Sequence, residues 1–409
     1  MKLSHHSPIV RKRCSTNNNL LKGMAMFQYE LRHMLILALV TLLAIATTAC
    51  AGTGGKRGHS QAHVIAVSSD APDDDLHGFM PARPFGQVVS ENFSLWANGT
   101  GVIDKERMGE LLGDPSIKGD SAAALAALAH GMFNKKHGLP ESMTRQELSI
   151  LDQSTPSLEH QYRHAAFRLS HINRSIFATG RPRFEMMKQG PSGNCYFFAP
   201  LGWMVKFRPD DIVTAIRRTN GGYLVRFPRG NEATVTEPTD AELVGFHSAR
   251  TLDDGLWVAV LEKALGELQA ETSARKAEIP NPILRIAFGG HGVQLIRLWS
   301  GNEIDNVPLA NTSATDIREA LKDMKAERLL TLTGTPKDVT GKLPGNHVFA
   351  VFGYRPELDK VVVWNPWGND FEPKGEEGIE NGYITKHGIF QMPLEEFVQV
   401  FSKLHIGRD

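Results

Sequence analysis

A cysteine where a glycine-rich loop meets an apolar run is the residue of this chain best suited to nucleophilic chemistry. Residues 189–198 read QGPSGNCYFF, which predicts a buried helix that begins at Cys195. The first turn of a helix presents unpaired backbone N–H groups and the positive end of the dipole, and both favour the nucleophilic thiolate. Gln189 lies on the loop side, where its amide can donate to an oxyanion beside the Cys195 N–H. The alternative is a structural cysteine, because free cysteine is among the most buried residue types.

A catalytic cysteine also needs a base, and the chain offers His347 with Asn365. His347 starts the strand-like run 347–354, and Asn365 ends the next run, 360–365. Antiparallel neighbours joined by a short loop place the start of one strand beside the end of the next, so we expect the two side chains to meet. In cysteine proteases a histidine takes the thiol proton, and an amide oxygen holds the ring in the productive tautomer. A lone histidine on an apolar strand is more often structural, but Cys195 and Gln189 together favour the catalytic interpretation.

The segments around these residues predict an α+β enzyme with its cleft between two lobes. Alternation and turn residues predict strands at 221–227 and 329–332. Helical spacing of apolar residues predicts helices at 256–268 and 316–327. Helices that precede a β-rich segment are typical of the α+β class.

The composition is that of an ordinary globular protein. Of 409 residues 41% are hydrophobic, and 45 Lys and Arg balance 45 Asp and Glu, so nothing indicates a nucleic-acid partner. The three cysteines are Cys14, Cys50 and Cys195, which argues against a disulfide framework.

The N-terminal part predicts export. The charge-free run 34–49 is shorter than the roughly 20 residues of a membrane-spanning helix and fits a secretory signal. Residues 47–50, TTAC, resemble a bacterial lipoprotein signal with an imperfect lipobox, so residues 1–50 predict either a lipid anchor at Cys50 or free secretion. The protein is therefore expected at the cell envelope or outside the cell, in contact with a membrane only through that anchor.

Two further regions precede the segment with the chemistry. Residues 51–91 are rich in Gly, Ser, His, Asp and Pro without periodicity, which predicts a flexible linker. Residues 92–182 predict a helical region, with a helix at 122–132 and another opening at 143–148. Residues 98–106 faintly resemble an EF-hand loop, but Trp96 and Arg107 stand where calcium ligands are needed, so we expect a degenerate, structural helix pair.

From residue 183 to the C-terminus the chain resembles the catalytic core of the calpain family, papain-like cysteine peptidases. The family motif Gln-Gly-x-x-Gly-(Asp)-Cys-(Trp)-Phe is similar to residues 189–197, and its Asn-Pro-Trp-Gly motif matches residues 365–368. The helix at 256–264, LWVAVLEKA, resembles the family's Leu-Trp-Val-x-Leu-Leu-Glu-Lys-Ala. Gly289-Gly290 before a helix at Leu295, and residues 388–392 with Phe397 and Phe401, also agree.

The resemblance implies a papain-like two-lobed fold, with the cysteine in a helical lobe and the histidine and asparagine in a β-rich lobe. It implies Cys195 as nucleophile, His347 as general base and acid, Asn365 as its orienting group and Gln189 as an oxyanion donor. It also implies that Trp367 shelters the His–Asn pair from water. No cofactor is required by the sequence itself, and calcium enters only through the family. The family's accessory calcium-binding and lipid-binding domains have no counterpart in the sequence.

Four positions depart from the family pattern. Asn194 replaces the usual Asp, Tyr196 the usual Trp, and Asn346 the usual Gly before the histidine. Pro200 interrupts the helix after Cys195, and we expect it in the first turn, where a missing N–H costs nothing. None of these changes removes a catalytic atom.

These observations predict an exported cysteine endopeptidase that acts on proteins or peptides through a thioester. One alternative is another papain-like acyl transfer, such as crosslinking or amide hydrolysis. A second is a non-catalytic surface protein that uses a protease-like core for binding. The complete Cys, His, Asn and Gln set argues against the second, because a binding module needs none of the four.

Overall fold

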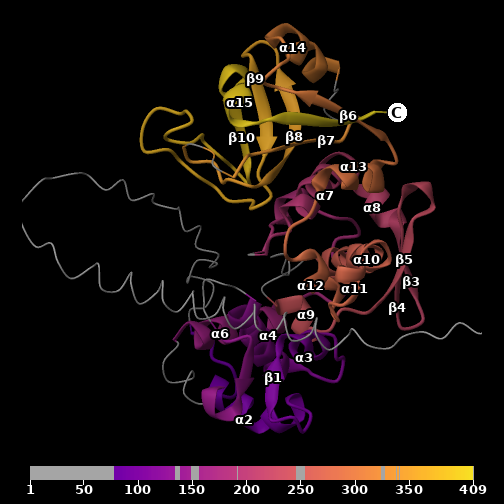
Figure 1. Cartoon of the computed structure of the whole chain (residues 1–409), viewed down its shortest axis with the longest axis vertical. Coiled ribbons are helices and arrows are strands. Elements are labelled where there is room, and N and C mark those ends of the chain that lie inside the picture. The colour runs from indigo at the N-terminus through magenta and orange to yellow at the C-terminus, as the bar shows by residue number, and fades with distance from the viewer. Residues whose placement is uncertain are drawn as a thin grey trace, which may run out of the picture. The chain divides into compact units, whose positions relative to one another are not determined.

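The computed structural model describes residues 78–133, 139–148, 156–190, 192–245, 254–323, 328–337, 339 and 341–408. The predicted export signal, Cys50 and most of the predicted linker lie outside these residues. Among the described residues, no helix is long and apolar enough to cross a membrane. Figure 1 shows the elements, which begin with helices, continue through a mixed segment and end in a large sheet.

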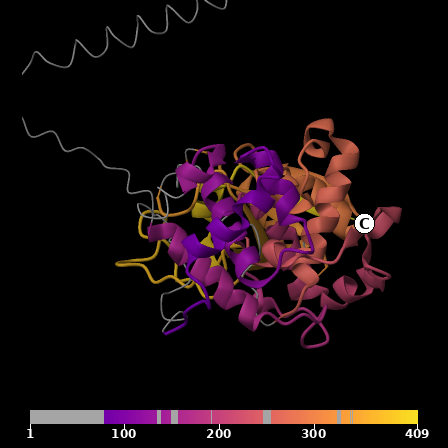
Figure 2. The same ribbon diagram turned by 90° about the horizontal axis from the view of Figure 1, so that it is seen from below.

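The first described elements form a helical region. It consists of α2 (Phe85–Trp96), β1 (Val102–Asp104), α3 (Lys105–Leu112), α4 (Gly119–Phe133), β2 (Ser142–Thr144) and α6 (Pro156–His171). Helix α2 begins inside the stretch predicted as linker, so the predicted boundary at residue 92 comes too late. The reason is that Phe85, Val88, Val89 and Phe93 recur at helical spacing and are all buried. Figure 2 looks onto these indigo and purple helices from below.

Two helix–strand–helix units make up much of this region. Strand β1 leaves α2 and leads into α3, and β2 follows α4 in the same way, with β1 and β2 antiparallel. Met143 and Thr144, predicted to open a helix, therefore lie in β2, and the helix starts only at Arg145. The prediction failed because Met143 is drawn into the sheet, where it pairs with Ile103 and both side chains are fully buried.

The middle of the chain surrounds the cysteine with helices and a small sheet. The sheet has the antiparallel order β3-β4-β5. The elements are η2 (Phe184–Met186), α7 (Cys195–Phe207), α8 (Pro209–Ala215), β3 (Ile216–Thr219), β4 (Gly222–Arg226), η3 (Pro228–Gly230), β5 (Glu232–Thr236), α9 (Asp240–Val244), α10 (Trp257–Thr272), α11 (Ala274–Ala277), α12 (Pro282–Ile286) and α13 (Gly292–Ser300).

The last part is a six-stranded antiparallel sheet with two helices. Its strand order is β10-β9-β8-β7-β11-β6. The elements are β6 (Glu303–Pro308), α14 (Ala314–Asp323), β7 (Thr331–Gly334), β8 (Val348–Arg355), β9 (Lys360–Trp364), β10 (Ile389–Pro393), α15 (Leu394–Val400) and β11 (Lys403–Arg408). Helices followed by antiparallel strands confirm the predicted α+β class.

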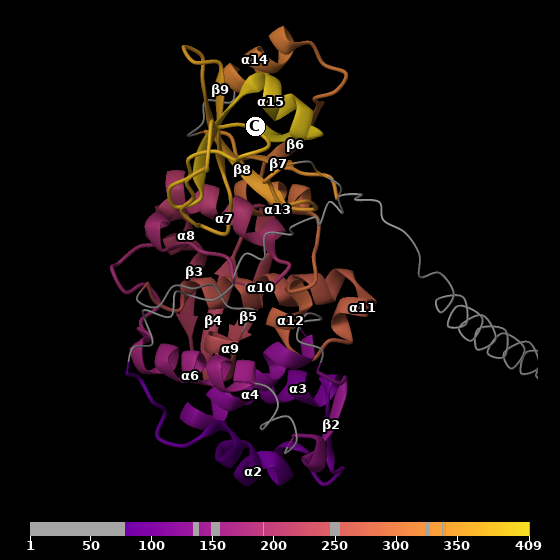
Figure 3. The ribbon, with the colours of Figure 1, turned by 90° about the vertical axis from the view of Figure 1, so that its left-hand side faces the viewer.

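Both faces of the large sheet are covered by apolar side chains, as the residues of strand β8 show. Phe349 and Val351 join a core with α14 and α15, whereas Ala350 and Phe352 join the core of α7, α10 and α13. Alternate residues of a strand point to opposite faces, so β8 is held between two apolar layers. Figure 3 shows α7 and α13 beside the ends of β7 and β8.

Helix α7 packs closely on this sheet because a glycine of the helix lies at the contact. A Cβ at Gly202 would lie 2.0 Å from the ring of Trp364, so only glycine lets the helix approach strand β9. Pro200, which we expected in the first turn, lies instead in the interior of α7. The helix continues past it because its surroundings are entirely buried, and packing outweighs the lost hydrogen bond.

Candidate active site

Cys195 is the first residue of α7, as the sequence predicts, and Asn194 is the N-cap. The preceding loop is held in place by a hydrogen bond of 2.7 Å from the Gly193 N–H to the Ala287 carbonyl. A Cβ at Gly193 would meet that carbonyl at 3.1 Å, which explains the glycine. Cys195 is 9% exposed, so it lies near the edge of the core.

The protonation of Cys195 differs from the expectation. Burial raises the pKa of the thiol, and the backbone N–H groups of Val348, Tyr196 and Cys195 itself, which bond to the sulfur, lower it by less. A helix N-terminus alone was expected to favour the thiolate. Loss of hydration outweighs it here, which disfavours the charged thiolate.

His347 and Asn365 meet as the antiparallel arrangement predicts. His347 immediately precedes β8, Asn365 immediately follows β9, and the two strands pair. His347 Nε2 lies 2.9 Å from Asn365 Oδ1, and both residues are buried. An amide oxygen can only accept, so this contact puts the hydrogen on Nε2 and leaves Nδ1 as the basic nitrogen.

Burial lowers the pKa of His347 to about 4, and the hydrogen bond to Asn365 opposes that shift. Together with the raised pKa of Cys195, this favours the neutral forms of the thiol and the imidazole.

Trp367 covers this histidine. The two rings lie 4.7 Å apart at 44°, and the Trp367 N–H donates to Asn365 Oδ1 at 3.1 Å. The same amide oxygen therefore accepts from the ring and from the turn that carries the tryptophan. This contact fits the shelter that the resemblance implies.

Backbone contacts bring the cysteine and histidine segments together. Val348, whose N–H reaches the Cys195 sulfur, directly follows His347. Asn346, on the other side of His347, has φ of 52°, a left-handed conformation that glycine adopts most readily and asparagine tolerates. The departure from the family's glycine is thus compatible with the local geometry.

Gln189 lies in the same neighbourhood, but its amide has a partner within the loop. Its backbone N–H donates to the Pro366 carbonyl at 2.8 Å, which joins the cysteine loop to the turn after Asn365. Its side-chain Nε2 donates to the Ser192 carbonyl at 2.7 Å. An amide nitrogen carries two hydrogens, so one remains for an oxyanion while the other fixes the side chain.

Sequence reasoning missed a carboxyl group beneath the cysteine. Glu262 on α10 lies next to Asn194 and accepts from its Nδ2 at 3.0 Å, and neither residue is exposed. The signal was present in the Leu-Glu-Lys-Ala segment, but a glutamate on an amphipathic helix is normally solvated.

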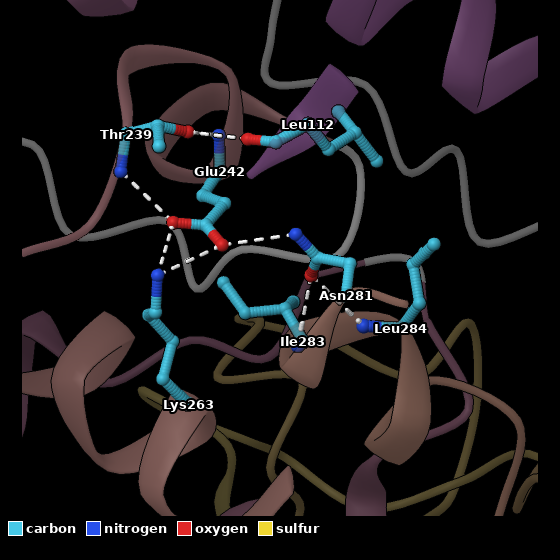
Figure 4. Close-up of polar contacts among 7 residues, drawn as sticks. All are labelled: Leu112, Thr239, Glu242, Lys263, Asn281, Ile283 and Leu284. Carbon is cyan, nitrogen blue, oxygen red and sulfur yellow. Dashed lines mark hydrogen bonds and ion pairs between the residues drawn. The ribbon is translucent and has the colours of Figure 1, made fainter. Parts of the chain in front are cut away.

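The next residue of α10 belongs to a second buried cluster (Figure 4). Lys263 donates to both Glu242 oxygens, at 2.7 and 3.0 Å, and Asn281 donates to one of them at 2.9 Å. Glu242 also forms a capping box with Thr239, whose hydroxyl donates to the Leu112 carbonyl of α3. The cluster satisfies its own charges and joins α9, α10 and α12 to the helical region, so we assign it a structural role.

A calcium ion does not fit the EF-hand-like loop, as its sequence predicts. Arg107 stands at the position of the bidentate ligand, and its Nε donates to the Trp96 carbonyl at 2.8 Å. Asp104 caps α3 by accepting from the Arg107 N–H. A guanidinium beside the first loop position repels a divalent cation, and the described residues contain no group of three or more His, Cys, Asp or Glu side chains that could hold a metal ion.

Comparison with known proteins gives two similar sequences. The chain is 24% identical over 295 residues to calpain-type cysteine protease ADL1 of Oryza sativa subsp. japonica, covering 63% of this chain and 13% of that protein. It is 24% identical over 324 residues to calpain-type cysteine protease DEK1 of Zea mays, covering 70% of this chain and 14% of that protein. No family model matches the chain. The chain thus spans a small part of these relatives, and the similarity supports a calpain-like cysteine protease.

Proposed function

We propose that this protein is a cysteine endopeptidase that hydrolyses peptide bonds of protein or peptide substrates through a Cys195 thioester. The observation that carries the proposal is the 2.9 Å contact of His347 Nε2 with Asn365 Oδ1, beside a cysteine at a helix N-terminus. That contact leaves Nδ1 as the base, which a thiol nucleophile requires.

In the first half-reaction His347 Nδ1 takes the Cys195 proton as the sulfur attacks the substrate carbonyl. The tetrahedral oxyanion accepts hydrogen bonds from the Cys195 N–H and from the remaining N–H of Gln189 Nε2. His347 then gives its proton to the leaving amine, and the thioester remains. A water attacks the thioester with His347 as base, and the acid product leaves as the thiol regains its proton.

Asn365 and Trp367 support the base rather than touch the reacting atoms. Asn365 Oδ1 keeps the Nε2–H tautomer and stabilises the imidazolium. The Trp367 ring covers the face of the imidazole and keeps water from the contact.

We also propose a papain-like arrangement in which α7 carries the nucleophile and the six-stranded sheet carries the base. The packing of Gly202 against Trp364 and the Val348 N–H at the Cys195 sulfur support it. No step of this mechanism needs calcium, which only the family resemblance suggests for the core.

The proposal extends to the location of a bacterial, exported enzyme. The apolar run 34–49 and Cys50 support export, with either a lipid anchor or free secretion. A lipid-anchored protein partitions into detergent, and Cys50→Ser abolishes that behaviour. A wild-type protein that stays in the aqueous phase indicates free secretion.

Labelling with an epoxysuccinyl thiol-protease probe, followed by cleavage of a peptide library, tests the proposed chemistry. We expect labelling at Cys195 and library cleavage, both lost in Cys195→Ala and retained in Cys50→Ser. Hydroxylamine in the assay separates the alternatives, because an acyl transferase diverts the thioester to the hydroxamate more than a hydrolase does. Full peptidase activity of Cys195→Ala contradicts the proposal, and a folded wild-type protein without labelling or cleavage favours the non-catalytic alternative.

A further inference from the structure

The Asn194 side chain does not cap the helix that it precedes. Asparagine at an N-cap usually accepts from the second or third N–H of its helix. Here Asn194 makes no such bond, although its backbone carbonyl accepts from the Phe197 and Phe198 N–H groups. Its amide turns to Glu262 instead, at 3.0 Å.

In this contact each of the two residues keeps one side-chain oxygen without a hydrogen-bond donor. Asn194 Oδ1 and Glu262 Oε2 are buried and have no hydrogen-bond partner among the described residues. Two buried acceptors without a donor are costly in the interior. A proton on Glu262 removes the problem, because the acid O–H can donate to the amide oxygen while the amide N–H donates to the acid carbonyl.

The charges around Glu262 do not offset this cost. Arg168 of α6 is the nearby cation, Glu242 of α9 acts in the opposite sense, and Lys263 on the same helix is committed to Glu242. Burial is the largest influence and raises the pKa of Glu262 well above its ordinary value.

We propose that Asn194 and Glu262 form an uncharged amide–carboxylic acid pair that holds the Asn194 side chain away from the α7 N-terminus. The Tyr196 N–H, the second of the helix, then stays available to the Cys195 sulfur instead of being taken by a side-chain cap. Glu262 is thus a positioning residue that acts through Asn194, and its kinetic consequence rests on the proposed function.

The variants Glu262→Gln, Glu262→Leu and Asn194→Ala, with the double variant Asn194→Ala/Glu262→Leu, test the positioning role. Glu262→Gln keeps both hydrogen bonds and should retain kcat/KM and the rate of Cys195 alkylation by iodoacetamide. Glu262→Leu releases Asn194 to cap the helix, and we expect about 100-fold lower kcat with little change in KM. Asn194→Ala should restore kcat in the Glu262→Leu background, because alanine has no side-chain oxygen to cap with.

Glu267→Gln is the matched control, since Glu267 lies on the same helix and pairs with Arg285 at the edge of the core. It should leave kcat and the alkylation rate unchanged. The alkylation rates do not depend on peptidase activity. They therefore separate a failure of this inference from a failure of the proposed function.

The protonation state of Glu262 can be measured separately, with wild type and Glu262→Gln alone, even if Glu262→Leu does not fold. An acid whose folded pKa is raised contributes stability below its unfolded pKa of about 4.3 and loses it as pH rises. The Tm of Glu262→Gln minus that of wild type should therefore grow between pH 5 and pH 8. Difference infrared spectra at pH 7 should show a protonated carboxyl band in wild type that Glu262→Gln lacks.

Two results overturn the inference. A Tm difference that stays flat between pH 5 and pH 8, without the carboxyl band, means that Glu262 is ionised. A Glu262→Gln variant as slow as Glu262→Leu, or a double variant as slow as the single one, means that Asn194 is not being held away from the helix.

Discussion

Replacing Asn365 by alanine tests the central contact of the candidate site. Asn365 Oδ1 accepts from His347 Nε2 at 2.9 Å and from the Trp367 N–H at 3.1 Å, in a buried setting. A hydrogen bond is worth about 0.5–1.5 kcal/mol when its donor is neutral and about 1.5–3 when the donor is charged. The contact therefore strengthens by about 1–1.5 kcal/mol as His347 becomes the imidazolium, which corresponds to about tenfold in rate.

Loss of the tautomer adds to this effect. Without Oδ1 the neutral ring can carry its hydrogen on Nδ1, where it cannot accept the thiol proton. We expect Asn365→Ala to lower kcat/KM by about 10- to 100-fold, less than His347→Ala, because the base remains but is less often in the right form.

The pH dependence of kcat/KM should also change, in a direction that the structure predicts. Burial lowers the pKa of His347 to about 4, and the Asn365 hydrogen bond works against it. Removing that bond should lower the pKa further, so the acidic limb of kcat/KM should move to lower pH while the plateau falls. A mutation that merely unfolds protein lowers the plateau without moving the limb.

Asn306→Ala is the matched control, because Asn306 Oδ1 contacts His405 Nδ1 at 2.6 Å in an exposed pair between β6 and β11. It removes the same kind of contact away from Cys195 and should leave kcat/KM unchanged. Asn365→Ala with a wild-type plateau, or with an acidic limb shifted to higher pH, refutes the assigned role.

Three further predictions follow from the geometry. Gln189→Ala should lower kcat by about 10²–10³ with little change in KM, since the Cys195 N–H remains; an unchanged kcat removes Gln189 from the oxyanion site. His347→Gln should resist acid better than wild type between about pH 6.5 and 4, by up to about 3 kcal/mol in unfolding free energy. The reason is that a lowered histidine pKa contributes stability above pH 6.5 that is lost on acidification; urea titrations with equal pH dependence contradict this. Calcium and a chelator should leave the Tm unchanged, whereas Arg107→Ala should lower it through loss of the bond to the Trp96 carbonyl; a calcium-dependent Tm in wild type contradicts the misfit.

The placement of the candidate residues was readable from the sequence because it depends on short-range patterns. A loop that ends in an apolar run placed Cys195 at a helix start, and two strands with a short connection placed His347 beside Asn365. Both inferences need only the geometry of one helix or one hairpin. The α+β class followed in the same way from periodicity.

The errors came from contacts between distant segments. Met143 joins a strand because Ile103 lies opposite it, and Pro200 is tolerated inside α7 because that helix is buried. The predicted direction of the Cys195 pKa was wrong because the sequence indicates a buried helix but not whether burial outweighs the effect of the helix N-terminus. The sequence already predicted that the EF-hand-like loop binds no calcium, and the contact of Arg107 with the Trp96 carbonyl adds a structural role for that arginine.

The role of Glu262 and Lys263 illustrates what tertiary contacts add to a motif. Neighbouring residues of a helix point about 100° apart, so the pair faces two different partners. Glu262 contacts Asn194 on the side of the cysteine, whereas Lys263 pairs with Glu242 on the side of α9 and the helical region. Removing one member of a buried ion pair costs about 3–5 kcal/mol, because the other charge is left without a partner. Replacing either residue should therefore have a different effect. Loss of Lys263 weakens the attachment of α9 to α10, whereas loss of Glu262 acts on the helix start that carries Cys195.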